Sequence, residues 1–381
     1  MVEIHGTCES AYEPMRDLMS ASIDAGTDVG ASVAVIHDGT MVADLWGGHA
    51  DEERTTPWEA DTITNVWSTT KTMTFLSAHI AADQGVIDFD RKVADYWPEF
   101  AAGGKEDIEV RHLMSHTSGV SGWAVPVTPE DVCDWDKSTA LLAAQEPWWE
   151  PGTASGYHAL NQGHLVGEVL RRATGQTLGT FFRTEVADKV GADFHIGLPA
   201  EHDHRVSKIV PPPPNEMVEG VDPESVAMKT FINPALDATM SHTETWRRAE
   251  IGAANGHGNA RSVATAQAAI THGGSWNGHQ LLSQGAIDRI FDEQISGIDQ
   301  VLGVDVAFGM GYGLRMADWT FLPEGRICFW GGWGGSLIIN DVDNHLTIAY
   351  MMNKMASAIL GDERGANLVT AAYAGAGIEL G

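Results

Sequence analysis

Ser68 and Lys71 are the first residues whose types and spacing suggest chemistry. They lie three positions apart in the stretch WSTTK (residues 67–71), just before a segment with helical apolar periodicity. Side chains at this spacing share one face of a helix, so the lysine amine would lie beside the serine hydroxyl. A partly desolvated lysine loses its proton near neutral pH and can serve as the base for a serine nucleophile. The alternative is that Ser68 only caps the helix.

Further motifs follow in a fixed order along the chain. They are RHLMSHTSGV (residues 111–120), PGTASGY (151–157), GHLVGEVLRRATGQ (163–176) and WGGWGGS (330–336), whereas the GxSxG pattern of α/β-hydrolases is absent. Together with WSTTK, this set resembles the serine β-lactamase-like superfamily. It is most similar to the family VIII carboxylesterases, which share the class C β-lactamase fold. The resemblance extends from about residue 30 to about residue 353.

The resemblance assigns a role to each matching residue. It implies that Ser68 is the nucleophile, that Lys71 is its partner, and that Tyr157 is the tyrosine of the second motif. It also implies an oxyanion hole formed by the backbone N–H groups of Ser68 and Trp333. The chemistry agrees, because a lysine and a tyrosine can together take the serine proton and return a proton to the leaving alcohol. For Tyr157 alone, a buried phenol with a purely structural hydrogen bond would be the alternative.

Two departures from the β-lactamase pattern indicate the substrate class. Trp330 stands where those enzymes carry the lysine of a KTG triplet, and Tyr157-His158-Ala159 lacks the asparagine of their YxN motif. Both changes favour a neutral ester over a charged lactam. The resemblance therefore implies a carboxylesterase that cleaves short-chain or small aryl esters through an acyl-enzyme. β-Lactamase, D-aminopeptidase or other amide hydrolase activity and acyl transfer stay open, as does a non-catalytic penicillin-binding-like protein.

The substrate pocket is expected to be mainly aromatic, since ligand pockets are mostly apolar with a few polar anchors. The residues expected to line it are Trp330, Gly331, Gly332, His158 and Trp123. Neither a cofactor nor a metal is expected. The segment His202-Asp203-His204 has two closely spaced histidines but no further placed ligands, so a solvated loop is the better interpretation.

The elements that must position these residues can be predicted from sequence pattern. Residues 31–46 form two β-rich runs around Asp38-Gly39, which predicts a hairpin. Residues 326–353 predict two or three more strands, and the segments 70–85, 159–176 and 262–274 predict helices. Strands at both chain ends with helices between them predict an α/β (α+β) fold. An antiparallel sheet domain (residues 1–65 and 255–381) would be flanked by helices and carry a mainly helical inserted domain (66–254), with the active site at their interface.

The amino-acid composition restricts the classes of molecule that this protein can bind. The formal net charge is −29, from 23 Lys plus Arg against 52 Asp plus Glu, which argues against nucleic acid or an anionic membrane as a partner. Solubility and adaptation to salt are both possible reasons for this charge. The three cysteines form no close pair, and no basic and apolar leader or membrane span is visible, so a cytoplasmic protein acting on a small ester is expected. Four prolines at 211–214 form either a connector or a lid over the site.

Overall fold

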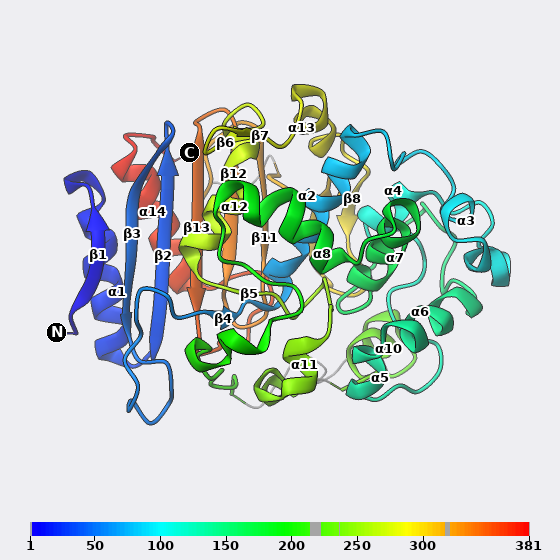
Figure 1. Cartoon of the computed structure of the whole chain (residues 1–381), viewed down its shortest axis with the longest axis horizontal. Coiled ribbons are helices and arrows are strands. Elements are labelled where there is room, and N and C mark those ends of the chain that lie inside the picture. Colours follow the sequence, from blue (N-terminus) through cyan, green and yellow to red (C-terminus); the bar gives the residue numbers. More distant parts are fainter. Residues whose placement is uncertain (1, 214–221, 236, 317–320, 381) are drawn as a thin grey trace.

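A nine-stranded antiparallel sheet forms the centre of the computed structural model, which describes residues 2–213, 222–235, 237–316 and 321–380 (Figure 1). The strand order is β1-β3-β2-β13-β12-β11-β10-β9-β8. The strands are β1 (Ile4–Cys8), β2 (Gly30–His37), β3 (Thr40–Gly48), β8 (Ile295–Ile298), β9 (Asp305–Phe308), β10 (Gly313–Leu314), β11 (Ile327–Gly331), β12 (Leu337–Asp341) and β13 (Leu346–Met352). Because β13 pairs with both β2 and β12, both chain ends build one sheet, as predicted.

The predicted hairpin joins β2 and β3. Its turn residues Asp38 and Gly39 both have positive φ angles, 47° and 79°. A two-residue turn of this kind matches the right-handed twist of the strands, and Asp-Gly is among the pairs that tolerate it. Strand β2 carries mainly small and branched apolar residues, and nearly all of its residues are buried.

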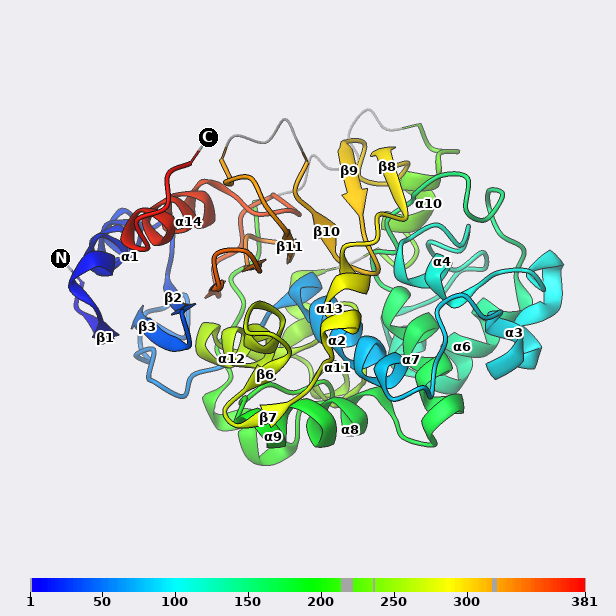
Figure 2. The ribbon, with the colours of Figure 1, turned by 90° about the horizontal axis from the view of Figure 1, so that it is seen from above.

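Helices cover both faces of the sheet (Figure 2). On one face lie α1 (Glu13–Ala25) and α14 (Glu363–Gly375), and on the other lies α12 (Ala260–Thr271). Helix α12 is rich in alanine and nearly all of its residues are buried, so its backbone can approach both the sheet and α2 closely. Asn259 caps its first turn by accepting a hydrogen bond from the Ser262 amide at 3.0 Å.

The middle of the chain is mainly helical, as predicted, and lies to the right of the sheet in Figure 1. Its α-helices are α2 (Thr70–Asp83), α3 (Val93–Tyr96), α4 (Val110–Met114), α5 (Pro129–Cys133), α6 (Trp135–Ala144), α7 (Gln162–Thr174), α8 (Leu178–Phe182), α9 (Asp188–Val190), α10 (Val226–Phe231) and α11 (Glu244–Arg248). Between the helical segment and the C-terminal strands lie two further elements, the hairpin β6 (Ser275–Trp276) and β7 (His279–Gln280) and the helix α13 (Gln284–Ile290).

The helical segment begins and ends at neighbouring points. The short strand β4 (Thr64–Asn65) pairs with β5 (His257–Gly258), with Thr64 opposite Gly258. The chain thus leaves the sheet layer and returns to it at one place. This pairing agrees with an inserted helical domain, whose boundaries at residues 66 and 254 stay a prediction.

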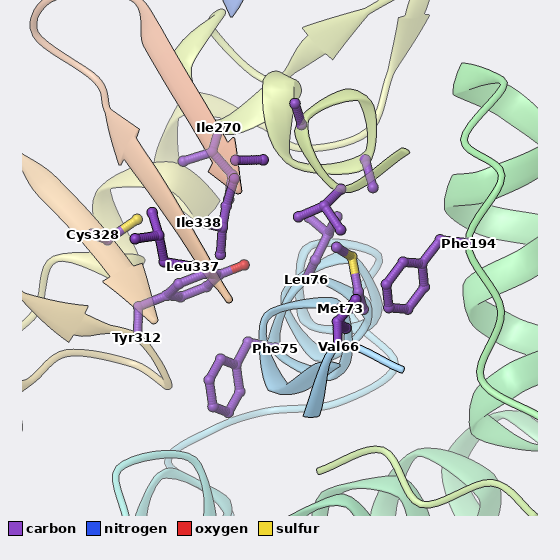
Figure 3. Packing of buried hydrophobic residues seen from close by; sticks show 14 of the residues in the cluster. Val66, Met73, Phe75, Leu76, Phe194, Ile270, Tyr312, Cys328, Leu337 and Ile338 are labelled. Atoms are coloured by element: carbon purple, nitrogen blue, oxygen red, sulfur yellow. The ribbon is translucent and has the colours of Figure 1, made fainter. Parts of the chain in front are cut away.

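A continuous apolar core fixes α2 against the sheet and α12 (Figure 3). The rings of Phe75 on α2 and Tyr312 beside β10 lie 5.3 Å apart. The Tyr312 hydroxyl also donates to the carbonyl oxygen of Thr72 and lies 3.0 Å from Gln267 Oε1 on α12. The first turns of α2 are therefore held from two sides, which matters because the predicted nucleophile precedes this helix.

Two further expectations concern surface and loop segments. No helix in the described part of the chain is long and apolar enough to cross a membrane. The proline segment leaves the sheet at Val210, which exchanges backbone hydrogen bonds with Asn353 and Met355 beyond β13. Pro214 and the seven residues after it lie outside the described residues. Whether the segment acts as a connector or a lid therefore stays open.

Candidate active site

Ser68 lies in the 3₁₀ helix Trp67–Thr69, immediately before α2. Trp67 adopts a φ of 48°, a left-handed conformation that is unfavourable for a bulky residue. Such backbone strain persists only where the surroundings enforce it, and it is concentrated at functional sites. Ser68 itself is 7% exposed, so only a small part of the residue is accessible.

Polar contacts from two segments hold this turn. The Val66 amide donates to the Gly256 carbonyl at 2.9 Å, and the Gly256 amide donates to Thr70 Oγ1 at 2.8 Å. From the sheet side, the Ser336 hydroxyl donates to the Val66 carbonyl at 2.8 Å. The turn that carries Ser68 is thus fixed between the end of the helical segment and the β11–β12 loop.

Lys71 is completely buried beside Ser68. Its Nζ lies 3.1 Å from Ser68 Oγ, 2.7 Å from the Ala159 carbonyl oxygen and 3.0 Å from the Ala253 carbonyl oxygen. Burial lowers the pKa of Lys71 well below its ordinary value. A neutral amine has two N–H groups, which the two carbonyls can accept, so its lone pair is left for the Ser68 hydroxyl.

Tyr157 completes the group around the serine. Its side chain hydrogen-bonds to Ser68, and its hydroxyl accepts a hydrogen bond from Trp330 Nε1 at 3.1 Å. Lys71 Nζ lies 4.6 Å from the centre of its ring. Burial raises the pKa of Tyr157 above its ordinary value, although its hydrogen bonds with Ser68 and Trp330 act in the opposite direction. The phenol is therefore protonated at neutral pH and can donate.

The glycine-rich loop after β11 brings a second backbone amide to the site. A Cβ built on Gly332 would lie 3.1 Å from the Ser68 amide nitrogen, so the loop passes directly over the start of the helix. The next amide belongs to Trp333. In the described part of the chain neither the Ser68 nor the Trp333 amide donates to a protein acceptor. Two free N–H groups beside the serine are the kind of donor that an oxyanion hole uses, and their role as such stays a prediction.

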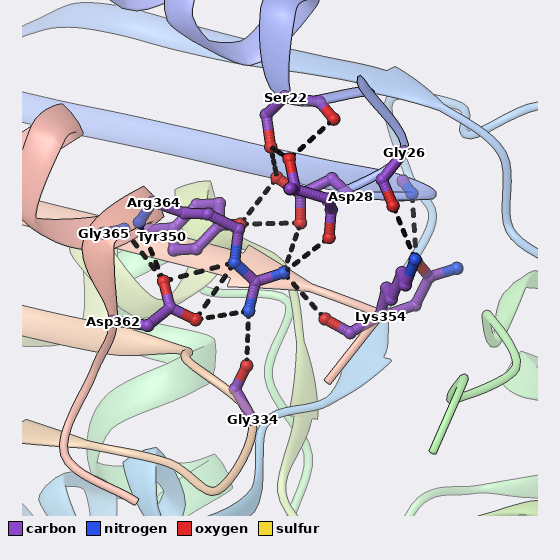
Figure 4. A network of polar contacts seen from close by, with 12 residues as sticks. Ser22, Gly26, Asp28, Gly334, Tyr350, Lys354, Asp362, Arg364 and Gly365 are labelled. Carbon is purple, nitrogen blue, oxygen red and sulfur yellow. Dashed lines mark hydrogen bonds and ion pairs between the residues drawn. The ribbon is translucent and has the colours of Figure 1, made fainter. Parts of the chain in front are cut away.

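A buried ionic network supports the far side of this loop (Figure 4). The Arg364 guanidinium donates to the Gly334 carbonyl at 2.6 Å and to Asp28 Oδ1 at 2.7 Å. It also pairs with Asp362, which caps α14. The residue after Trp333 is thereby tied to both the α1–β2 connection and the C-terminal helix.

His158 and Trp123, both expected to line the pocket, are buried, and their place in a pocket wall stays a prediction. His158 Nδ1 donates to the Gly156 carbonyl at 2.6 Å, so Nε2 must accept from the Ser118 hydroxyl. Burial lowers the pKa of His158 to about 3. Trp123 is packed in the helical core, where its indole N–H donates to the Ser138 carbonyl. Both residues fill the interior because their neighbours offer the hydrogen-bond partners that a buried polar side chain needs.

Trp330 and Gly331 end β11, and Gly332 begins the loop beside Ser68, while their role as a pocket wall stays a prediction. Trp330 has a further contact. It is 2% exposed, and its ring lies 5.3 Å from that of Tyr157. Sequence reasoning placed Trp330 in the pocket wall and did not anticipate its hydrogen bond to the tyrosine hydroxyl. His116 accepts a hydrogen bond from the His158 amide at 3.0 Å and packs on the Tyr157 ring.

One residue near the tyrosine was not found from the sequence. Asp299 Oδ1 accepts a hydrogen bond from the Tyr157 amide at 3.0 Å. It lies in the segment DQVLG, which carries no motif, and it is 142 residues away in the chain. No local sequence pattern therefore predicted a role for Asp299.

No group of three or more His, Cys, Asp and Glu residues is placed to hold a metal within the described ranges. In the segment His202-Asp203-His204, the carboxylate of Asp203 forms ion pairs with Arg247 and Arg248. This carboxylate is therefore already neutralised by protein cations.

Comparison with known proteins agrees with this geometry. The family model described as Beta-lactamase matches residues 15–372. The Esterase/beta-lactamase LipL of Mycobacterium tuberculosis is 33% identical over 87% of this chain and 78% of its own length. A crystal structure of a family VIII carboxylesterase is 41% identical with a TM-score of 0.91, covering 97% of this chain and 99% of that one.

A penicillin-binding protein homologue from Caulobacter crescentus is also similar. It is 34% identical with a TM-score of 0.88, and the similarity covers 98% of this chain and all of that one. The family model and these relatives extend over nearly the whole chain, including the serine, lysine and tyrosine described above. The chain belongs to the beta-lactamase family, as its motifs predicted.

Proposed function

We propose that this protein is a serine carboxylesterase that cleaves short-chain or small aryl esters through an acyl-enzyme on Ser68. The observation that carries the proposal is the completely buried Lys71, whose amine lies 3.1 Å from the Ser68 hydroxyl oxygen while Tyr157 contacts the same serine. An uncharged amine in that position is a base for a serine nucleophile. The esterase names of LipL and of the family VIII structure support the same substrate class.

In the acylation step, Ser68 Oγ forms a bond to the ester carbonyl carbon while its proton moves to Lys71. The carbonyl oxygen becomes an oxyanion and accepts hydrogen bonds from the Ser68 and Trp333 amides. The carbon–oxygen bond to the alcohol then breaks. Tyr157 gives its proton to the departing alkoxide and recovers a proton from Lys71, so that both residues end in their starting states.

Deacylation uses the same groups, with the proton moving in the reverse direction. Water attacks the acyl carbon and gives a proton to the Tyr157 oxygen while Tyr157 passes its own proton to Lys71. The carbon–Oγ bond of Ser68 then breaks, and Lys71 returns the proton to Ser68 Oγ. Ser68 recovers its proton and the carboxylic acid leaves. His116 and His158, the histidines beside Tyr157, are weak bases because burial lowers their pKa values, so the mechanism assigns them no proton transfer.

The neutral surroundings of the site favour esters over charged lactams. Trp330 directs its indole N–H to Tyr157 and offers no cation for a lactam carboxylate. The name Esterase/beta-lactamase of LipL nevertheless favours a second, slower activity on β-lactams. Because both reactions pass through an acylated serine, one experiment can measure them together.

The test is hydrolysis of p-nitrophenyl acetate, butyrate and octanoate, with nitrocefin in parallel, by the wild type and by Ser68→Ala. We expect rapid turnover of the two short esters, slow or absent turnover of nitrocefin, and loss of all activity in the variant. Nitrocefin turned over faster than every ester would make β-lactamase the better description. Ester turnover unchanged by Ser68→Ala would show that Ser68 only caps the helix. Covalent labelling by penicillin without any turnover would indicate a binding protein.

A further inference from the structure

Asp299 connects the β8–β9 turn to the loop that carries Tyr157. Its Oδ1 accepts hydrogen bonds from the Val301 and Leu302 amides at 2.8 and 2.9 Å, which close its own turn. The same oxygen accepts the Tyr157 amide at 3.0 Å. A second bond runs in parallel, from the Gln300 amide to the Ser155 carbonyl at 2.9 Å. The turn and the tyrosine loop are thus joined at two points.

The Asp299 carboxylate brings a negative charge that its turn does not need. Asp299 is 1% exposed, and its other oxygen, Oδ2, is buried without a hydrogen-bond partner. Within the described part of the chain, its side chain accepts hydrogen bonds from backbone amides alone. An asparagine would offer the same acceptor without burying a charge, which is costly when no cation neutralises it. A buried charge that the turn does not need calls for another reason.

The carboxylate lies at the backbone amide of a tyrosine whose side chain has few charged neighbours. Among the described residues, the titratable groups around Tyr157 are Lys71, His116, His158 and Asp299 itself. Burial holds both histidines neutral, and Lys71 has a lowered pKa for the same reason. The negative charge of Asp299 adds to burial in raising the pKa of Tyr157.

We infer that Asp299 is a positioning residue for Tyr157, holding the tyrosine backbone so that its hydroxyl stays on Ser68, with a fixed negative charge beside the phenol. The inference rests on the proposed esterase function and deepens it. The anchor keeps the tyrosine in line with the departing alkoxide. The charge opposes tyrosinate formation, so Tyr157 serves as the proton donor and Lys71 as the base.

Two substitutions separate the anchor from the charge. Asp299→Asn keeps an acceptor for the three amides and removes the charge, whereas Asp299→Ala removes both. Asp341→Asn is the matched control. Asp341 is also a buried turn carboxylate, accepting from the Asn344 amide at 3.1 Å, but it lies at the end of β12 away from Gly331. For each protein we would measure thermal stability, the pH profile of kcat/KM on p-nitrophenyl butyrate, and Ser68 labelling by a fluorophosphonate.

For Asp299→Asn we expect the alkaline limb of the pH profile to move to lower pH, because loss of the charge lets Tyr157 ionise more readily. For Asp299→Ala we expect kcat to fall about 10- to 100-fold with little change in KM, the cost of a displaced catalytic group. Asp341→Asn should lower stability and leave the pH profile unchanged.

The inference would be overturned if both Asp299 variants kept the wild-type kcat and pH profile, or if Asp341→Asn shifted the profile equally. Wild type and Ser68→Ala are measured alongside. Wild-type protein that neither hydrolyses esters nor labels at Ser68 would instead refute the proposed function, and the inference with it. If Asp299→Ala does not fold, the pH profile of Asp299→Asn still tests the inference, because this variant keeps an acceptor for the three amides.

Discussion

The indole rings of Trp67 and Trp333 pack edge to face, with centroids 5.0 Å apart and planes at 64°. Trp67 directly precedes Ser68, and Trp333 carries the other free amide of the site. The contact therefore ties together the two backbone segments that would hold the oxyanion. Distances between such donors matter at the level of tenths of an ångström, because hydrogen bonds weaken quickly with misalignment.

Trp333→Ala keeps the amide but removes the ring that holds it. We expect kcat on p-nitrophenyl butyrate to fall about 10- to 100-fold, since misplaced donors stabilise the transition state less. Trp333→Phe should retain most of the activity, because a smaller ring can still pack on Trp67. Steady-state kinetics of the two variants check this. Equal activity of Trp333→Ala and wild type would mean that the loop is held without the ring contact.

Gly332→Ala should displace the same loop by a steric clash. A Cβ at this position would lie 2.4 Å from the Val66 carbonyl oxygen and from Ser336 Oγ, so the loop must move away from Ser68. We expect a loss in kcat of about 100- to 1,000-fold, comparable to removing an oxyanion donor. Gly331→Ala is the control, because the nearest atoms to its Cβ are 3.2 Å away. The prediction is wrong if both variants lose activity to the same extent.

The pH dependence should follow the ionisation of Lys71. Its pKa is lowered by burial, so the neutral amine is favoured in the folded protein. The value of kcat/KM should rise with pH as Lys71 loses its proton and decline only in strongly alkaline solution, where Tyr157 ionises. The same group makes stability rise with pH between the lowered pKa and the ordinary value of 10.5, because there the unfolded chain binds the extra proton.

Lys71→Arg tests this assignment. A guanidinium cannot lose its proton under these conditions, so the variant should be inactive at every pH. A pH–rate profile from pH 5 to 10, with far-ultraviolet circular dichroism to check folding, measures the effect. Activity of Lys71→Arg at high pH would mean that another group is the base.

Arg364→Ala should affect both stability and catalysis. The substitution leaves the buried carboxylates of Asp28 and Asp362 without their cation, which costs about 3–5 kcal/mol in the free energy of unfolding. It also frees the Gly334 carbonyl, so kcat should fall under conditions where the protein is folded. Urea denaturation and kinetics at low temperature separate the two effects.

The control for Arg364 is Arg326→Ala. Arg326 pairs with Asp343 and Asp288, but its side chain is 45% exposed, so the change should cost no more than about 1 kcal/mol. If Arg364→Ala and Arg326→Ala lost the same free energy of unfolding, Arg364 would not be the residue that stabilises the loop at Gly334.

Much of this architecture could be predicted because its signals are local. The Asp38-Gly39 turn selects a hairpin by its backbone preferences, and the helix of Lys71 is visible from apolar periodicity and ends before Gly85. The strands β8 to β10 were not predicted. They are two to four residues long, and β8 is largely exposed, so they lack the buried alternation that marks a strand.

The parts of the site that depend on distant contacts were beyond the sequence. Whether His158 faces the pocket or the interior depends on the Ser118 hydroxyl, 40 residues away. Trp123 was expected in the pocket wall, and its contact with the His164 ring of α7 could not be foreseen from the sequence. Asp299 meets Tyr157 only because the sheet brings β8 beside the helical segment. Contacts between elements far apart in sequence leave no periodic pattern to detect.

The central place of β13 sets an order for folding during synthesis. The hairpin β2–β3 is made early, yet its partner β13 follows only after roughly 300 further residues, which take about 15–60 s to translate. Until then the apolar β2 has an unpaired edge, a template for wrong pairing between chains. Conditions that slow translation of the second half should therefore raise the demand for chaperones, and the yield of this protein should depend on elongation rate more than on its final stability.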